Sequence, residues 1–403
     1  MLLHAIIPSL KRQIKLCRLL GFKSYKLSAK NGTLVETTYP KGHTWYKFLL
    51  IVVVSFALFV TFNGFYGIYR LSGSKILANN VGFASLVLTI MTSITIFADM
   101  SISLLTLRKK REVIHVLNMV YNMEIQHKPS SQKWGDLLII GTIYMCQIAS
   151  PIYSIATVIP AAFDPCATPW VGSLWLRYEF DQSTKTMNNI CNWPKNSVSW
   201  DAIQIILVVI QSYFAVYIMF VSVLSACHFM IVLLISMARL LKQLLENVTK
   251  QETAFWDSKM MDRYRGLYVL EKCLNDAYQD GFIAFSLAAL VTCIILTFYI
   301  SLRVLGLKDG HIGLLVFPVV VIELVVLTAI FTKMGGSVYT TSGLILKNMR
   351  KKHANGRKCL EMKVHKSMPK LKVRFGQNFL EMATSLQVLH FSVDRTVNLL
   401  LIG

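Results

Sequence analysis

Long, unbroken runs of apolar residues alternate with polar segments along the whole chain. Each run suffices for a helix that crosses a hydrocarbon core of about 30 Å at roughly 1.5 Å per residue. A seventh run starts near Met382 or Phe391 and is still apolar at Ile402, so we expect the sequence to end inside it. Because the runs are continuous rather than alternating, they predict an all-α polytopic membrane protein with seven transmembrane helices. The first six runs occupy residues 45–69, 83–107, 137–163, 202–237, 282–302 and 312–331.

Positively charged side chains are concentrated in every second segment between these runs. The segments before the first run, after the second, after the fourth and after the sixth are basic. The remaining segments hold few cations or balance them with acids. Because cation-rich segments stay on the cytosolic side of a membrane, the pattern predicts a cytosolic N-terminus and an extracellular C-terminus. We expect a multi-pass protein of the plasma membrane.

Composition and net charge fit this interpretation. The chain is 54% hydrophobic and only 16% charged, which is poorer in charge than ordinary soluble domains. A net charge of +21 would also suit a protein that binds nucleic acid, but the confinement of the cations to alternate segments is explained by membrane topology. Such segments can also touch anionic lipid, although topology is the role that this distribution favours.

Apolar stripes at helical spacing predict further helices outside the bilayer. One stripe runs from Ile6 to Leu20 among lysines and arginines, and predicts a helix that lies either in the membrane interface or packed against the cytosolic part. The fourth run continues through Leu245 and is expected to project into the cytosol. Similar stripes over residues 264–278, and over 371–389 after Pro369, predict two more helices that join a cytosolic bundle.

Polar residues within the apolar runs are the candidates for a ligand site, because polar groups in lipid are costly and usually face a cavity or a partner. Asp99 is expected to pair with a neighbouring helix or the nearby basic segment. Amides, a carboxylate and aromatic rings in the outer and middle parts of the runs suit a pocket for a hydroxylated ligand. Hydrogen bonds between helices explain the same residues equally well, so both interpretations stay open. The candidate pocket residues are Tyr153, Gln204, Gln211, Tyr299 and Glu323.

Cysteine positions and catalytic motifs narrow the function classes. Cys166 and Cys191 are the cysteines expected outside the cell, where a disulfide between them or two free thiols are both open. The sequence contains no His-Glu-x-x-His motif, no glycine-rich phosphate loop of the Walker type and no Cys-x-x-Cys pair. We therefore expect neither an enzyme nor a bound metal or cofactor.

The last stretch, HFSVDRTVNLLLIG at residues 390–403, resembles the beginning of the final helix of insect gustatory receptors. The long fourth helix, the small outer loops and the very basic last inner segment are also similar to that family. The resemblance implies a ligand-gated, non-selective cation channel of four like subunits, homomeric or heteromeric, opened by a tastant such as a sugar or a bitter compound. The final helices would line its pore. The pore or gating residues would then be Asp394, Arg395, Asn398, Leu399 and Ile402.

Together these predictions divide the chain into four parts. Residues 1–44 form a basic cytosolic segment, and residues 45–337 form a six-helix bundle with the ligand pocket and cytosolic helix extensions. Residues 338–381 supply a basic cytosolic loop with an anchor helix, and residues 382–403 begin the pore-lining helix. Two alternatives remain: a secondary transporter of a small solute, for which internal repeats are expected, and a modulatory subunit without its own pore.

Overall fold

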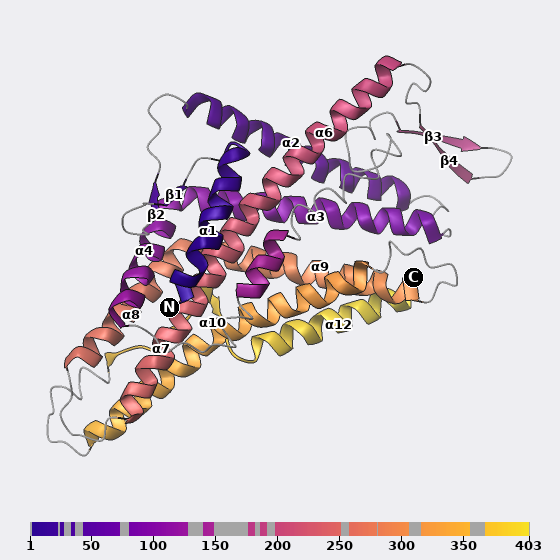
Figure 1. Ribbon diagram of the computed structural model, residues 1–403. Coiled ribbons are helices and arrows are strands. Elements are labelled where there is room, and N and C mark those ends of the chain that lie inside the picture. Colours follow the sequence, from indigo (N-terminus) through magenta and orange to yellow (C-terminus); the bar gives the residue numbers. More distant parts are fainter. Residues whose placement is uncertain are drawn as a thin grey trace.

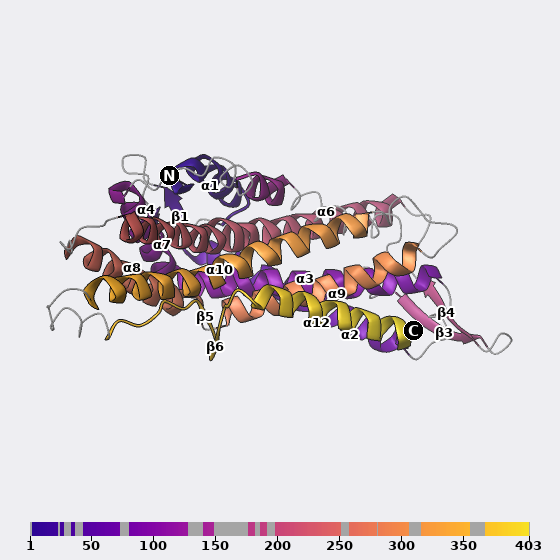
Figure 2. The same ribbon diagram turned by 90° about the horizontal axis from the view of Figure 1, so that it is seen from below.

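The computed structural model describes residues 2–22, 25–27, 34–36, 43–72, 80–127, 140–148, 176–181, 186–191, 198–250, 258–279, 281–305, 316–354 and 367–402. Long helices run side by side through an elongated bundle (Figures 1 and 2). The N-terminus and the C-terminus lie toward opposite ends of that bundle in Figure 2. The hairpin of β3 (Leu176–Asp181) and β4 (Thr186–Cys191) lies at the same end as the C-terminus.

The apolar runs of the sequence coincide with helices. The first, second, fifth and seventh runs correspond to α2 (His43–Ser72), α3 (Asn80–Arg108), α9 (Phe282–Leu305) and α12 (Thr384–Ile402). The third run is described only as a helix over residues 140–148. Within the described residues, four stretches are long and apolar enough to cross a bilayer: Lys47–Gly64, Ala202–Thr249, Phe282–Leu302 and Pro318–Lys351. The prediction of a mostly helical membrane protein is thus confirmed, while the number of crossings and their orientation stay predictions.

The fourth run forms one continuous helical stretch from residue 198 to residue 250. It comprises α6 (Val198–Val223), a π-helical segment η3 (Leu224–Ile231) and α7 (Val232–Lys250). At 1.5 Å per residue the stretch is about 80 Å long, far more than a bilayer core requires. The predicted extension beyond the membrane is therefore confirmed. The π-helical turns were not anticipated from the sequence.

Further helices pack beside α7. The sixth run continues far past its predicted end as α10 (Val316–Ala354), whose later half lies along α7. The predicted amphipathic helix is confirmed as α8 (Ser258–Tyr278), whereas α4 (Lys110–His127) had not been predicted. A buried hydrogen bond of 2.7 Å from the Ser236 hydroxyl to the Glu124 carboxylate joins α7 to α4.

The N-terminal helix α1 (Leu2–Leu19) packs against the bundle. Its apolar stripe is buried at Ile6, Leu10, Ile14 and Cys17, against α6, η3, α4 and α7. Packing against the protein is therefore the correct alternative, and a helix with its apolar face in the lipid is wrong. A short hairpin of β1 (Tyr25–Leu27) and β2 (Leu34–Glu36) follows α1.

The prediction of a helix directly after Pro369 is wrong. The chain there is extended and turns back in a small hairpin of β5 (Arg374–Phe375) and β6 (Asn378–Phe379), with Gly376 at a φ of 59°. Leu371 and Leu380 are completely buried in this extended form, so their spacing reflects burial in a hairpin rather than a helical face. The final helix α12 begins only at Thr384.

Candidate functional site

One face of α12 is held against α9. Ser392 and Thr396 are four residues apart and therefore share a face, and both side chains are buried. The Thr396 hydroxyl reaches the Ile295 carbonyl of α9 at 3.5 Å and donates at 2.8 Å to the Ser392 carbonyl of its own helix. This seam fixes which side of α12 turns away from α9.

The opposite face of α12 carries an exposed polar strip, formed by Gln387, Asp394 and Asn398. Their spacings of seven and four residues place them on one side of the helix, and all three are exposed. The Asn398 amide donates to the Asp394 carboxylate at 3.4 Å. An ionised or amide side chain turned toward lipid costs roughly 2–3 kcal/mol near the bilayer centre. If α12 crosses a bilayer, the strip needs water or a polar partner beyond those that the described residues supply.

Neighbouring predicted pore residues take different positions on α12. Arg395 lies beside the strip, with its guanidinium carbon 5.0 Å from the centre of the Phe391 ring. Leu399 is 39% exposed, nearer the seam. Ile402 is the last residue of α12, and its side chain is not among the described parts of the structure. Asp394 and Asn398 are thus the predicted pore residues that face directly away from α9.

The approach to α12 is fixed by a close backbone contact with α10. A Cβ added at Gly336 would lie 2.5 Å from the Glu381 carbonyl carbon and 2.6 Å from the Met382 nitrogen. The rings of Tyr339 and Phe379 have their centres 4.9 Å apart, and the Lys372 ammonium lies 4.5 Å from the Phe379 ring centre. The segment that leads into α12 is therefore held against the second half of α10.

The predicted pocket residues are distributed over three helices. Gln211 is buried in α6 and donates to the Leu207 carbonyl at 3.1 Å, and Gln204 lies two turns away on the same helix. Tyr299 is buried in α9, whereas Glu323 is exposed on α10. Tyr153 lies outside the described residues. Their assembly into one pocket stays a prediction.

The intramembrane acid Asp99 pairs between helices. The Ser222 hydroxyl of α6 donates to the Asp99 carboxylate of α3 at 2.5 Å. The second oxygen of Asp99 is buried without a hydrogen-bond partner among the described residues. The prediction that Asp99 bonds a neighbouring helix is confirmed, and the residue acts as a polar link between spans two and four.

A second polar junction joins α1, the helix over residues 140–148 and the π-helical segment. The His228 Nε2 atom accepts from the Gln147 amide at 3.0 Å and lies 3.1 Å from the Ser9 hydroxyl. The Gln147 amide also donates to the Ser9 carbonyl at 3.1 Å, and the Gln13 amide donates to the Phe220 carbonyl at 2.8 Å. All these side chains are buried. The only sequence signal for this junction is the presence of polar residues on the apolar stripe of α1.

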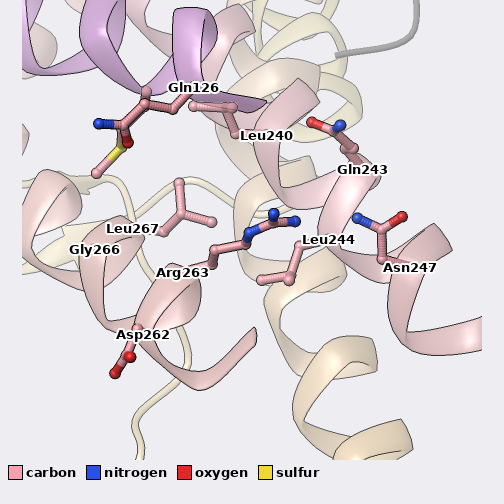
Figure 3. Close-up of a pocket in the computed structure, with 10 residues that line it drawn as sticks. Gln126, Leu240, Gln243, Leu244, Asn247, Asp262, Arg263, Gly266 and Leu267 are labelled. Carbon is pink, nitrogen blue, oxygen red and sulfur yellow. The ribbon is translucent and has the colours of Figure 1, made fainter. Parts of the chain in front are cut away.

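A cavity of about 370 Å³ lies between α4, α7 and α8 (Figure 3). Leu240, Leu244 and Leu267 contribute apolar surface to it. Gln243, Asn247 and Arg263 contribute polar groups. This cavity does not include any of the predicted pocket residues.

The described residues include only one of the two cysteines of the predicted disulfide. Cys191 ends β4 opposite Leu176 in β3, and Cys166 lies outside the described residues, so the disulfide stays a prediction. Within the described part of the chain, no group of three or more histidine, cysteine or acidic side chains comes together to hold a metal ion.

Comparison with solved structures places this architecture among known membrane proteins. No protein-family model and no curated protein sequence matches the chain. The structure is similar to that of the insect olfactory receptor OR5 from Machilis hrabei, with a TM-score of 0.60, 11% identity and coverage of 100% of both chains. It is also similar to the same receptor in complex with eugenol, with a TM-score of 0.56, 12% identity and coverage of 100% of both chains. The chain is a helical polytopic membrane protein. Its fold is the one seen in this insect olfactory receptor.

Proposed function

We propose that this chain is a subunit of a chemosensory receptor that works as a ligand-gated, non-selective cation channel. The exposed polar strip of α12 carries the proposal. A helix that packs one face on its own subunit and turns Asp394 and Asn398 outward is suited to the wall of a water-filled pore. The fold shared with an insect olfactory receptor and the resemblance of residues 390–403 to gustatory receptors support the same function.

In this proposal four like subunits surround a central axis in the plasma membrane, with the N-terminus in the cytosol. Each α12 turns its polar strip toward the axis, and permeant cations pass along the four strips. The carboxylate of Asp394 favours cations over anions by its charge. The cytosolic helices α4, α7, α8 and α10 form the anchor beneath the bilayer.

The ligand in this proposal is a small tastant, such as a sugar or a bitter compound, bound among the outer halves of the helices. Gln204, Gln211, Tyr299, Tyr153 and Glu323 remain the proposed contacts. The related olfactory receptor has been solved with eugenol, a small molecule. A ligand opens such a channel only through its higher affinity for the open arrangement of the helices. Variants in the proposed pocket should therefore shift the ligand concentration that gives half-maximal current.

The test is voltage clamp of cells that express the full chain, with sugars, bitter compounds and eugenol as ligands. A saturating, ligand-evoked cation current is expected. Asp394→Asn should change the relative permeability of cations and anions while the half-maximal concentration stays within about two-fold. Asp262→Asn is the matched control, because Asp262 is an exposed acid on α8 outside the bilayer, paired with Arg265.

Two results would contradict the proposal in different ways. Uptake of labelled ligand without any ligand-evoked current would indicate a secondary transporter. Current that requires a second, different receptor chain and is insensitive to Asp394→Asn would indicate a modulatory subunit without its own pore.

A further inference from the structure

The outward face of α1 is a continuous cationic surface. Ile6, Leu10 and Cys17 turn toward the bundle, and the opposite side of the same helix is exposed. Neither aspartate nor glutamate occurs in α1, and none of its cations forms an ion pair with an acid among the described residues. The exposed cations of this face are Lys11, Arg12, Lys15 and Arg18.

The C-terminal end of α1 contacts α6 and the beginning of α2. The Tyr213 hydroxyl of α6 donates to the Leu20 carbonyl at 2.7 Å. A Cβ at Gly21 would lie 2.6 Å from a methyl carbon of Leu49, which stands near the start of the apolar stretch of α2. Phe48 and Ile51 lie near Leu49 on α2, and their exposed apolar side chains are suited to contact lipid. The C-terminal end of the cationic face therefore lies beside the first residues of the apolar stretch of α2.

We propose that this face of α1 binds the headgroups of anionic phospholipids in the leaflet on the N-terminal side, and that the bound lipid holds α1 on the π-helical segment of span four. Arg12 lies over the Tyr144 ring at 6.0 Å, and no cation of this face forms an ion pair with an acid among the described residues. Such a row of cations, next to the start of an apolar stretch, complements a negatively charged membrane surface. Leu19, 74% exposed beside Arg18, can dip into the acyl boundary.

The buried side of α1 supplies the link from lipid to span four. Ser9 and Gln13 contact His228 and the Phe220 carbonyl, at and just before the π-helical turns. A π-helical turn leaves backbone carbonyls in positions where side chains can reach them, and such turns are frequent at functional sites. Lipid that binds α1 more tightly in this packed position than in a detached one stabilises these contacts. This inference does not depend on channel activity or on ligand identity.

The test uses the full chain in nanodiscs that contain a photoactivatable phosphatidylserine or, in parallel, the matching phosphatidylcholine. Cross-linked peptides from residues 9–22 are quantified by mass spectrometry. Since each cation near an anionic surface contributes about five-fold to affinity, Lys15→Gln combined with Arg18→Gln should reduce phosphatidylserine labelling of α1 by roughly 25-fold at low salt. Salt near 1 M, where the Debye length is about 3 Å, should also reduce it.

A matched control removes the same charge elsewhere. Lys347→Gln with Lys351→Gln neutralises two exposed lysines of the cytosolic part of α10 and should leave the labelling of α1 unchanged. Equal labelling by the two lipids, or an equal loss in both double variants, would overturn the proposed lipid surface. Nanodiscs present the same lipid on both faces, so this outcome is independent of membrane orientation.

Hydrogen exchange tests the second half of the proposal. Amides of α1 should exchange more slowly in phosphatidylserine than in phosphatidylcholine nanodiscs, and the Lys15→Gln and Arg18→Gln double variant should abolish the difference. Identical exchange of α1 in both lipids would show that the lipid does not hold the helix.

Discussion

Replacement of Gly336 by alanine tests the contact that positions the final helix. The new Cβ would lie 2.5 Å from the Glu381 carbonyl carbon, 2.6 Å from its oxygen and 2.6 Å from the Met382 nitrogen. These neighbours are backbone atoms, so no change of rotamer relieves the overlap. The segment into α12 must move away from α10 by several tenths of an ångström or more, and the packing between them is lost.

The magnitude follows from two opposing effects. Alanine is favoured over glycine within a helix by about 1 kcal/mol. Overpacking costs about 1–3 kcal/mol, and a rigid backbone neighbour places Gly336→Ala at the upper end of that range. We therefore expect a net loss of about 1–2 kcal/mol in stability. We also expect altered gating, because α12 begins directly after the displaced segment.

Thermal denaturation of the purified protein in detergent, followed by fluorescence-detected size-exclusion chromatography, measures the effect. Gly343→Ala on the same helix is the control, since its Cβ would meet only the flexible end of Lys370 at 3.5 Å. That variant should be as stable as the parent or more stable. If Gly336→Ala melts at the same temperature as Gly343→Ala or higher, the close approach of the two backbones is incorrect.

Further variants test individual polar contacts. Ser222→Ala removes the donor to the buried Asp99 carboxylate and should lower the free energy of unfolding by about 1–3 kcal/mol. Ser225→Ala should cost less, because the Ser225 hydroxyl donates only to the Val221 carbonyl of the same span; melting temperatures compare the two variants. Tyr264→Phe removes the donor to the Pro369 carbonyl and should lower the free energy of unfolding by about 0.5–1.5 kcal/mol. Tyr268→Phe is its control: it keeps the ring that lies under Lys272, so its melting temperature should equal that of the parent. Burial raises the pKa of Glu271 above 4.5, so the folded state favours the neutral carboxyl, and this stabilisation is lost as the pH rises through the raised pKa. Glu271→Gln keeps an oxygen toward Asn275, so its melting temperature should rise relative to that of the parent as the pH increases above 4.5, until the carboxyl of the folded parent is ionised. A difference in melting temperature that does not change with pH would refute the role of ionisation.

The apolar runs were sufficient to predict the helical membrane fold. A helix in lipid must satisfy its backbone within itself and cover about 30 Å, so its requirements are local and visible in the sequence. The same holds for the long fourth helix and for α8, whose apolar stripes repeat at helical spacing. Asp394 and Asn398 were named as pore residues from the family resemblance, and that role stays a prediction.

Other features depend on contacts between distant parts of the chain. The extended segment before α12 follows from its fit against α10 and α8, where Asn275 bonds both the Lys372 carbonyl at 2.8 Å and the Arg374 amide at 2.9 Å. These external partners, about one hundred residues away, replace the hydrogen bonds that a helix would have made. Periodicity alone predicted a helix for this segment. The prediction failed because an apolar residue at every third or fourth position is also compatible with a buried hairpin.

The sequence by itself determined where the chain can cross a membrane, because lipid imposes the same length and polarity on each segment separately. Only the tertiary structure decided which side of α12 turns outward, how α1 reaches His228 across more than two hundred residues, and where span four becomes π-helical. These features arise from pairs of surfaces that meet after folding, and the free energy of such a pair is not encoded in the pattern of either segment alone.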